Sequence, residues 1–402
     1  PYIYKTENYG KTWRQITNGI GAEDFTRALR ADPKRKGLLY AGTERGMYIS
    51  FDDGSNWNKF QLNLPIVPIT DLAIKNDNLI AATQGRSFWM IDDLTPMHQL
   101  TTSLVQEDVI LFKPQDSYRM GGGNGRTSKT EGTNHPGGVA INYFIKEKDA
   151  KEPVSLQIHD SNDVLIKTFS TDPNKEKKEA KLTLENGNNI FYWDMMYPGA
   201  EKVKGMILWW ASLNGPMALP GNYKVTLTMG ETSKSQNFSI LKNPISETTL
   251  ADATAQFDFI NDINTKVTEI HKALKNVKKV RAQVISLQKS IKDKEKHTEL
   301  LDYAASLLKE MTIIEETLYQ TKSKSGQDPL NFPIRLNNKL AHLNSLTRIG
   351  SYAPTQQAID FKNEINKEID KELSKLYDLF NNKVTVLNKK VKDSQIDLIQ
   401  LD

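Results

Sequence analysis

The sequence predicts a multidomain protein with a partial β-propeller, an immunoglobulin-like β-sandwich and a C-terminal α-helical bundle. Three observations lead to this fold class. A unit of about forty residues repeats near the N-terminus, which is typical of propeller blades. Short alternating strands then continue to residue 244, after which apolar residues recur at helical spacing. The chain has 402 residues, too many for one ordinary hydrophobic core.

The composition is that of a water-soluble globular chain and excludes several classes of site. Lys and Arg number 53 against 49 Asp and Glu, and the two signs are interleaved along the sequence. We therefore expect no nucleic-acid partner. No apolar run approaches the length of a membrane helix, so we expect no membrane span. Cysteine is absent, which excludes disulfides, zinc–thiolate sites and cysteine nucleophiles.

The repeat at the N-terminus has a regular order of strands. Residues 40–53 match residues 80–93, and residues 4–13 match residues 48–57. Each unit has an apolar strand, a strand of small residues, a turn with Gly and Arg, and an aromatic strand. We assign residues 1–113 to the last two or three blades of a propeller.

A turn motif closes two of these units and resembles the Asp-box of sialidase-like and sortilin-like propellers. In such a turn glycine takes a positive φ, the Asp or Asn side chain caps backbone amides, and the tryptophan packs underneath. The third unit keeps Asp92 and Asp93 but has Leu94 in place of glycine. The motif residues are Thr6, Asn8, Gly10 and Trp13 in one copy, and Ser50, Asp52, Gly54 and Trp57 in the other.

The turns with arginine are expected on the propeller face opposite the Asp-box turns, where ligands commonly bind. Arg45, Arg86 and Trp89 are therefore our candidate ligand-binding residues. Solvated arginines and a packed tryptophan are the alternative. Asp52 is expected to be structural, since hydrolysis of a glycoside needs two carboxylates that face one cleft. We assign no catalytic, cofactor-binding or metal-binding residue and expect no cofactor.

The centre of the chain is predicted to contain a linker followed by a sandwich. Residues 114–137 are rich in glycine and are assigned to a flexible linker. Residues 138–244 are assigned to the immunoglobulin-like sandwich of about seven strands. The expected strands cover residues 139–145, 154–159, 164–169, 188–194, 221–228 and 236–240.

Residues 245–402 are assigned to the helical bundle. Apolar stripes at three- and four-residue spacing predict helices near 257–277, 300–318, 336–343 and 355–391, with Thr355 as a cap. His271, His297 and His342 fall on different helices without a metal-binding pair. We expect a separate module for packing or protein contact.

Longer segments carry a family resemblance over nearly the whole chain. Residues 82–96, 189–200 and 351–358, together with the Asp-boxes, resemble the C-terminal part of the sortilin-like BNR-repeat proteins of Bacteroidetes-type bacteria. These proteins are often labelled glycosyl hydrolases. Gln84 stands where the family usually has histidine. The resemblance implies a secreted, periplasmic or cell-surface protein, an export signal in a preceding segment, and the N-terminal remainder of the same propeller as a partner.

Three functions are compatible with these observations. The first is a non-catalytic binding or scaffold protein of the cell envelope or extracellular space, which holds a protein, peptide or glycan on a propeller face. The second is a sialidase- or xyloglucanase-like glycoside hydrolase whose catalytic acids lie mainly in N-terminal blades outside this chain. The third is a structural component of an envelope assembly. We favour the first, so we expect no enzyme activity of this chain.

Overall fold

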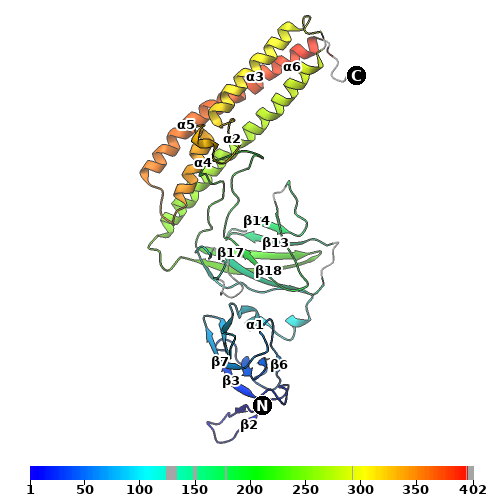
Figure 1. Cartoon of the computed structure of the whole chain (residues 1–402), viewed down its shortest axis with the longest axis vertical. Coiled ribbons are helices and arrows are strands. Elements are labelled where there is room, and N and C mark those ends of the chain that lie inside the picture. Colours follow the sequence, from blue (N-terminus) through cyan, green and yellow to red (C-terminus); the bar gives the residue numbers. More distant parts are fainter. Residues whose placement is uncertain (124–133, 148–151, 177–178, 292, 395, 397–402) are drawn as a thin grey trace.

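The computed structural model describes residues 1–123, 134–147, 152–176, 179–291, 293–394 and 396. The chain is elongated, with β-sheets toward the N-terminus, a larger β unit in the centre and a slanted group of helices beyond it (Figure 1). The N-terminus and the last helix lie at opposite ends of this arrangement. No helix among the described residues has the length and apolarity that a membrane crossing requires.

The first part of the chain forms small antiparallel sheets in which neighbours in sequence pair with each other. A hairpin joins β1 (Tyr4–Lys5) and β2 (Arg14–Gln15). A four-stranded sheet follows, and then a three-stranded one, in the order predicted for the repeat. Their strands are β3 (Thr26–Ala31), β4 (Leu39–Thr43), β5 (Gly46–Ser50), β6 (Asn58–Lys59), β7 (Ile69–Lys75), β8 (Asn78–Thr83) and β9 (Phe88–Ile91).

These two sheets pack closely against each other. Leu38 and Tyr40 share one buried core with Ile69 and Leu72 of β7. Gly42 lies at the contact, where an added Cβ would come within 2.7 Å of an Ile69 methyl carbon. Glycine at this position therefore allows the close approach of the two sheets.

The third copy of the turn differs because leucine replaces glycine. Leu94 is fully buried in the core between the sheets, and the helix α1 (Thr95–Gln99) begins directly after it. The Asp93 carboxylate accepts hydrogen bonds from the Thr95 amide at 2.8 Å and from the Asn142 side chain at 3.0 Å. Asp93 thereby connects the front of the chain to the central β unit.

The central unit is a sandwich of two sheets around one core that includes Trp193, Leu156 and Val225. All six predicted strands are present. One sheet has the order β10 (Val109–Leu111), β12 (Val139–Ile145), β16 (Gly187–Trp193). The other has the order β11 (Ser117–Tyr118), β18 (Thr232–Leu241), β17 (Gly221–Met229), β13 (Val154–His159), β14 (Leu165–Ser170), β15 (Ala180–Lys181).

The sandwich begins earlier than the sequence indicates. β10 pairs with β12, and β11 pairs in parallel with β18, so residues 109–118 supply strands upstream of the expected start at 138. Arg119, in the expected linker, is buried and donates to the Ala218 carbonyl at 2.9 Å. The start of the expected linker is thus a strand, because the sheet edges bind it. Residues 124–133 lie outside the described residues.

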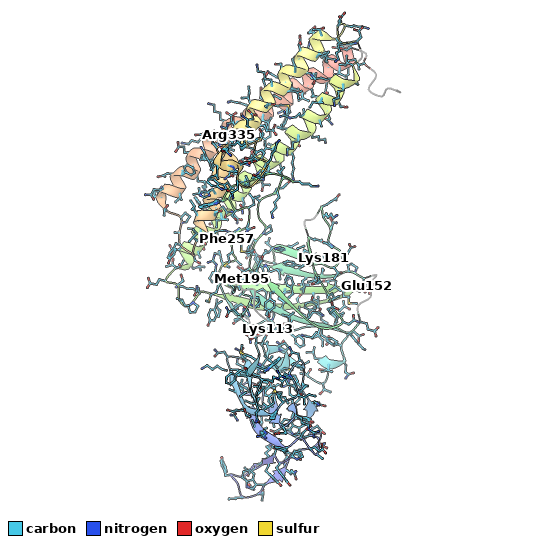
Figure 2. All side chains as sticks on the ribbon, viewed as in Figure 1. Lys113, Glu152, Lys181, Met195, Phe257 and Arg335 are labelled. Atoms are coloured by element: carbon cyan, nitrogen blue, oxygen red, sulfur yellow. The ribbon has the colours of Figure 1, made fainter. Side chains whose placement is uncertain are left out.

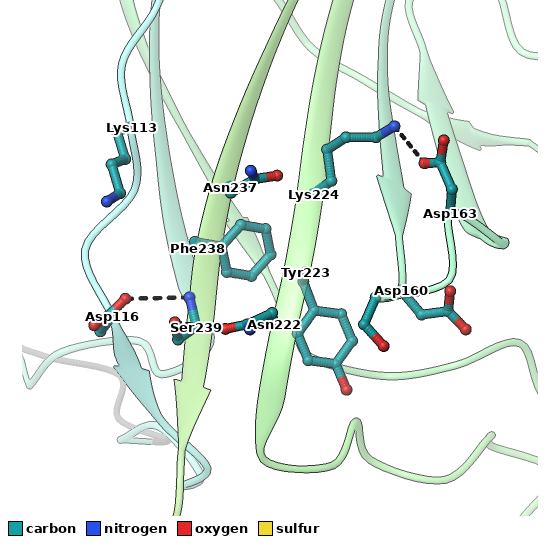
Figure 3. A pocket seen from close by; sticks show the side chains of 11 residues that line it. Lys113, Asp116, Asp160, Asp163, Asn222, Tyr223, Lys224, Asn237, Phe238 and Ser239 are labelled. Atoms are coloured by element: carbon teal, nitrogen blue, oxygen red, sulfur yellow. Dashed lines mark hydrogen bonds and ion pairs between the residues drawn. The ribbon is translucent and has the colours of Figure 1, made fainter.

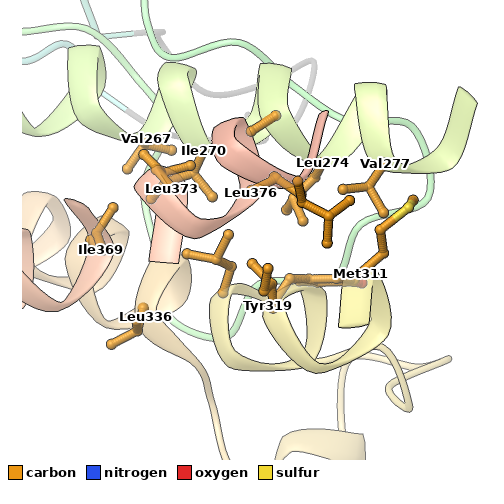
Figure 4. Close-up of a cluster of buried hydrophobic side chains, with 14 of the residues drawn as sticks. Val267, Ile270, Leu274, Val277, Met311, Tyr319, Leu336, Ile369, Leu373 and Leu376 are labelled. Carbon is orange, nitrogen blue, oxygen red and sulfur yellow. The ribbon is translucent and has the colours of Figure 1, made fainter. Parts of the chain in front are cut away.

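The helices are α2 (Leu250–Ser290), α3 (Thr298–Leu318), α4 (Leu336–Thr347), α5 (Gln356–Asp378) and α6 (Val384–Asp393). Thr249 and Asp252 form a capping box at the start of α2, and Thr355 caps α5 as predicted. The single long helix expected near the C-terminus is divided by a π-helical turn at Leu379–Lys383. Figure 4 shows the shared core, in which Val267 and Leu274 face Leu373 and Leu376.

The helical unit is not separate from the sandwich, contrary to expectation. Residues 195–220 leave the end of β16 and run onto the helices before they return to β17. Ala200 is buried in the helical core, and Met206, Leu208, Ala211 and Leu213 pack against it. The apolar faces of the helices therefore bury a segment that the sequence assigns to another domain.

Candidate binding surfaces

The Asp52 turn is held by its own side chains. The Ser50 hydroxyl donates to the Asp52 carboxylate and accepts from the Gly54 amide, both at 2.9 Å. The carboxylate also accepts from the Asn56 amide at 2.8 Å. Desolvation favours the neutral form, but hydrogen bonds from Asn56 and Ser50 prevail and lower the pKa of Asp52. The acid is used to close the turn.

The earlier copy of the turn repeats this pattern with uncharged side chains. The Thr6 hydroxyl accepts from the Gly10 amide at 2.8 Å, and Asn8 accepts from the Thr12 amide at 2.9 Å. Gly10 and Gly54 both have positive φ, at 87° and 84°. The two turns therefore form equivalent hydrogen bonds at equivalent positions.

The tryptophans of the two turns differ. Trp57 is 3% exposed, and its indole donates to the Ile16 carbonyl at 2.8 Å. Trp13 is 60% exposed, so the predicted packing is wrong for this copy. Ile16 and Ile20, from the segment before β3, cover Trp57. No described segment covers Trp13 in the same way.

The two turns with arginine lie on one face of the front sheets. The turn at residues 44–45 precedes β5 and the Asp52 turn follows it, so the two turns lie at opposite ends of this strand. The turn at residues 84–87 comes directly after Thr83, and Thr83 pairs with Ile69 of β7. Ile69 in turn packs against Gly42, near the end of β4 that leads into the turn at residues 44–45. Both arginine turns are therefore at the same end of adjacent sheets, away from Asp52.

We call this end the arginine face and define it by Phe25, Arg27, Arg45, Arg86 and Phe88. Arg27 pairs with Glu44 at 2.5 Å and lies over the Phe25 ring at 5.3 Å. Phe25 is 49% exposed and Phe88 is 78% exposed. The face thus combines guanidinium groups with accessible aromatic rings.

The acids at this face have defined partners. Arg45 pairs with Glu23 at 2.7 Å and lies 3.9 Å from Asp24. Asp24 accepts a 2.6 Å hydrogen bond from the Tyr48 hydroxyl, and burial raises the pKa of Tyr48. These interactions hold Arg45 beside Glu23 and Asp24, and the raised pKa of Tyr48 is consistent with its hydroxyl acting as the donor to Asp24.

Trp89 has a packing role that distinguishes it from the two arginines. Its ring packs against the core between the sheets and lines a cavity of about 40 Å³ with Met47 and Phe60. Its indole donates to the Arg86 carbonyl at 2.9 Å, which fixes the turn that presents Arg86. We therefore do not include Trp89 in the arginine face.

The sandwich carries a polar hollow of about 580 Å³ that sequence reasoning did not find. Figure 3 shows Asp116 beside Ser239, and the Ser239 amide donates to the Asp116 carboxylate at 3.1 Å. The same view shows Lys224 paired with Asp163. The Asp160 carboxylate accepts from two amides of its own turn. These residues are distant in sequence, and only strand pairing brings them together.

A second unanticipated surface is an apolar groove of about 630 Å³ between α4 and α5. Its walls include Leu343 of α4, Phe361 of α5 and the connection between the helices. Ile349 and Tyr352 of that connection are 72% and 67% exposed. The sequence signal for this groove is the pair Ile349 and Tyr352 in the segment between the two predicted helices, and such a segment predicts a helix boundary as readily as a surface.

The histidines show no sign of a metal site. His271 of α2 is fully buried, and its Nδ1 lies 2.6 Å from the Glu201 carbonyl. His342 of α4 has Nδ1 2.7 Å from the Trp210 carbonyl. Among the residues that the structure describes, no group of three His, Cys, Asp or Glu side chains has an arrangement suited to a metal ion.

The geometry defines a chain of β-sheets with a C-terminal helical region and several accessible surfaces. No model of a known protein family matches the chain. A comparison with curated proteins also gives no match.

Comparison with solved structures gives remote similarities. One is to the extracellular domain of a one-component system from B. thetaiotaomicron, at 10% identity and a TM-score of 0.18. The match covers 58% of this chain and 28% of that one. Another is to YCF48 bound to D1 peptide, at 12% identity and a TM-score of 0.19, covering 59% and 60%.

Proposed function

We propose that the protein is a non-catalytic binding or scaffold protein of the cell envelope or extracellular space. Its arginine face holds a protein, peptide or glycan that carries acidic groups. The observation that carries this proposal is the position of Arg27, Arg45 and Arg86 at one end of adjacent sheets, beside exposed Phe25 and Phe88. Guanidinium groups bind carboxylates through paired N–H donors, and exposed rings add apolar contact.

The alternative of a glycoside hydrolase has less support from the acids of the front sheets. Asp52 closes its turn, Asp24 accepts from Tyr48, and Glu44 pairs with Arg27. A hydrolase needs one carboxyl group to protonate the leaving oxygen and a second on the other side of the bond. Carboxylates held in turns and ion pairs are better suited to fix the face than to perform this reaction.

The propeller assignment belongs to the same proposal. The sheets in meander order, the two turns with equivalent hydrogen bonds and the close contact at Gly42 all support blades of one ring. We propose that further blades of the same protein complete this ring. The secreted, periplasmic or cell-surface location is part of this proposal, as is the relationship to sortilin-like BNR-repeat proteins.

The test measures binding of the full chain to arrays of glycans and peptides. We expect retention of uronate- or sialate-bearing glycans, or of Asp/Glu-rich peptides, over neutral matched ligands. Arg86→Glu should weaken binding by about tenfold or more, since it removes one charge-assisted contact and adds repulsion. Lys36→Glu is the matched control, because Lys36 is exposed at the opposite end of β4.

Two results would contradict the proposal. One is equal loss of binding in Arg86→Glu and Lys36→Glu, which would indicate a general charge effect. The other is hydrolysis of a polysaccharide by the purified full chain that Asp24→Asn or Glu44→Gln abolishes. That result would assign the face to catalysis.

A further inference from the structure

The groove between α4 and α5 has a basic end and an apolar end. Lys339, His342, Leu346 and Ile349 follow each other at intervals of three and four residues, which places them on one side of α4 and its extension. Lys339, His342, Leu346 and Ile349 line the groove. The stripe changes from cationic to apolar along the helix.

The positive charge at the start of α4 has no partner in the described chain. Arg335 is the N-cap and Lys339 lies in the first turn, and both are exposed. No carboxylate among the described residues forms an ion pair with either side chain. The sequence contains no Asp or Glu from residue 329 to residue 359. Cations at a helix N-terminus oppose the helix dipole, so these charges do not stabilise α4.

The backbone of Trp210, from another part of the chain, contacts a residue that lines this groove. The Trp210 carbonyl lies 2.7 Å from Nδ1 of His342, and the Trp210 side chain is 75% exposed. Its φ is +50°, a left-handed conformation that costs free energy for a residue other than glycine. The segment 195–220 thus presents an exposed tryptophan in a strained conformation, and the backbone of this tryptophan contacts His342. Tryptophan, tyrosine and arginine are the residues that contribute most often to binding energy at protein interfaces.

We propose that this groove binds an amphipathic segment of a partner protein. The apolar side chains of the bound segment occupy the space between Leu346, Ile349 and Phe361. The acidic residues of the segment meet Lys339 and, one turn earlier, Arg335. Charge complementarity selects an acidic polypeptide as the occupant, and the volume of about 630 Å³ accommodates several side chains. This surface is on the helical unit and is independent of the arginine face.

The test selects peptides from a random displayed library against the folded full chain. Groove-dependent peptides should be enriched in Asp or Glu together with Leu, Ile or aromatic residues. Leu346→Ser should weaken their binding by about tenfold, and Lys339→Glu should change the selected charge from acidic to basic. Lys389→Glu is the matched control on exposed α6 and should leave the selection unchanged.

Three outcomes would overturn the proposal. The first is that no selected peptide is sensitive to Leu346→Ser while circular dichroism shows that the variant is folded. The second is binding of phosphatidylglycerol vesicles that Leu346→Ser removes, which would assign the groove to a lipid surface. The third is a dimer in solution that the same variant dissociates. Arg86→Glu should leave peptide selection by the groove intact, so this test is independent of the proposed function.

Discussion

At the scale of single residues, equivalent positions in the two Asp-box-like turns differ in burial. The hydrogen bonds of both turns are local, and they form in each copy. The tryptophan depends on a neighbouring segment, which is present over Trp57 and absent over Trp13 among the described residues. The motif therefore predicts the turn more reliably than the burial of its aromatic residue.

This difference gives a paired prediction for stability. Trp57→Ala should reduce the free energy of unfolding by about 3–5 kcal/mol, because it removes a buried ring and leaves the Ile16 carbonyl without its donor. Trp13→Ala should have a much smaller effect, since the ring is mostly in solvent. Chemical denaturation followed by circular dichroism measures both. Equal losses of unfolding free energy in the two variants would contradict the difference in burial between Trp57 and Trp13.

A second residue, His271, predicts a dependence of stability on pH. Its Nδ1–H donates to the Glu201 carbonyl, and its Nε2 accepts from the Asn337 side chain at 3.4 Å. Burial, with a smaller contribution from nearby Lys275, lowers the pKa of His271 below its ordinary value of 6.5. The unfolded chain then binds the proton more tightly than the folded chain.

The stability contributed by neutral His271 is therefore complete above about pH 6.5 and decreases as the pH falls through and below that value. Denaturation curves between pH 7.5 and pH 5 should show this loss, and His271→Asn should reduce the slope. The exposed His135 provides the control, and His135→Asn should retain the slope of the original chain. A slope that His271→Asn leaves unchanged would show that other groups cause it.

At the scale of elements, polar side chains of α2 and α4 bind the backbone of residues 195–220. Asn338 accepts from the Trp209 amide at 2.6 Å and donates to the Trp209 carbonyl at 2.9 Å. Asn264 and Asn344 both donate to the Asn214 carbonyl. These asparagines interrupt the apolar stripes because a loop without strand partners needs donors and acceptors from its surroundings. In the sequence, Asn264 is a polar residue within the apolar stripe of residues 257–277, and no local pattern explains it.

Asn338→Ala should loosen this segment. It removes two partly buried hydrogen bonds and leaves the Trp209 amide and carbonyl without protein partners, at a cost of about 1–3 kcal/mol. Hydrogen exchange should show faster exchange of amides in residues 205–213, while β12 and β16 remain protected. Asn388→Ala, at an exposed position of α6, is the control. Unchanged exchange in Asn338→Ala would mean that apolar packing alone holds the segment.

At the scale of the whole molecule, hydrogen bonds, strand pairing and an ion pair connect regions that the sequence assigns to different domains. Asp93 binds Asn142, and β10 pairs with β12. Arg119 of the sandwich donates to the Ser351 hydroxyl in the connection before α5 at 2.6 Å. Lys275 of α2 pairs with Glu201. The sandwich is thus joined to both of its neighbours by specific polar contacts as well as by chain connection.

Residues 1–113 expressed alone should fail to form a stable monomer. Truncation removes β12, the partner strand of β10, and so adds an unpaired edge at β10. β9, with exposed Phe88 and Met90, is already at the edge of its sheet in the full chain. Unpaired edges with apolar side chains promote association of chains. Size-exclusion chromatography should show aggregates, in contrast to the full chain under the same conditions. A monomer that unfolds cooperatively would contradict this prediction.

The sequence by itself determined the local structure: the repeated meander, both turns, six strands of the sandwich and the helical stripes, since each depends on side-chain periodicity or on bonds within a few residues. It also identified Arg45 and Arg86 as residues of turns. The tertiary structure decided the rest, because the remaining features join residues far apart in sequence. Val109 is a sandwich residue only beside Ile145, Asn338 has a role only against Trp209, and the groove exists only where α4 and α5 meet. Such contacts depend on which faces pack together, and no periodicity within one segment records that choice.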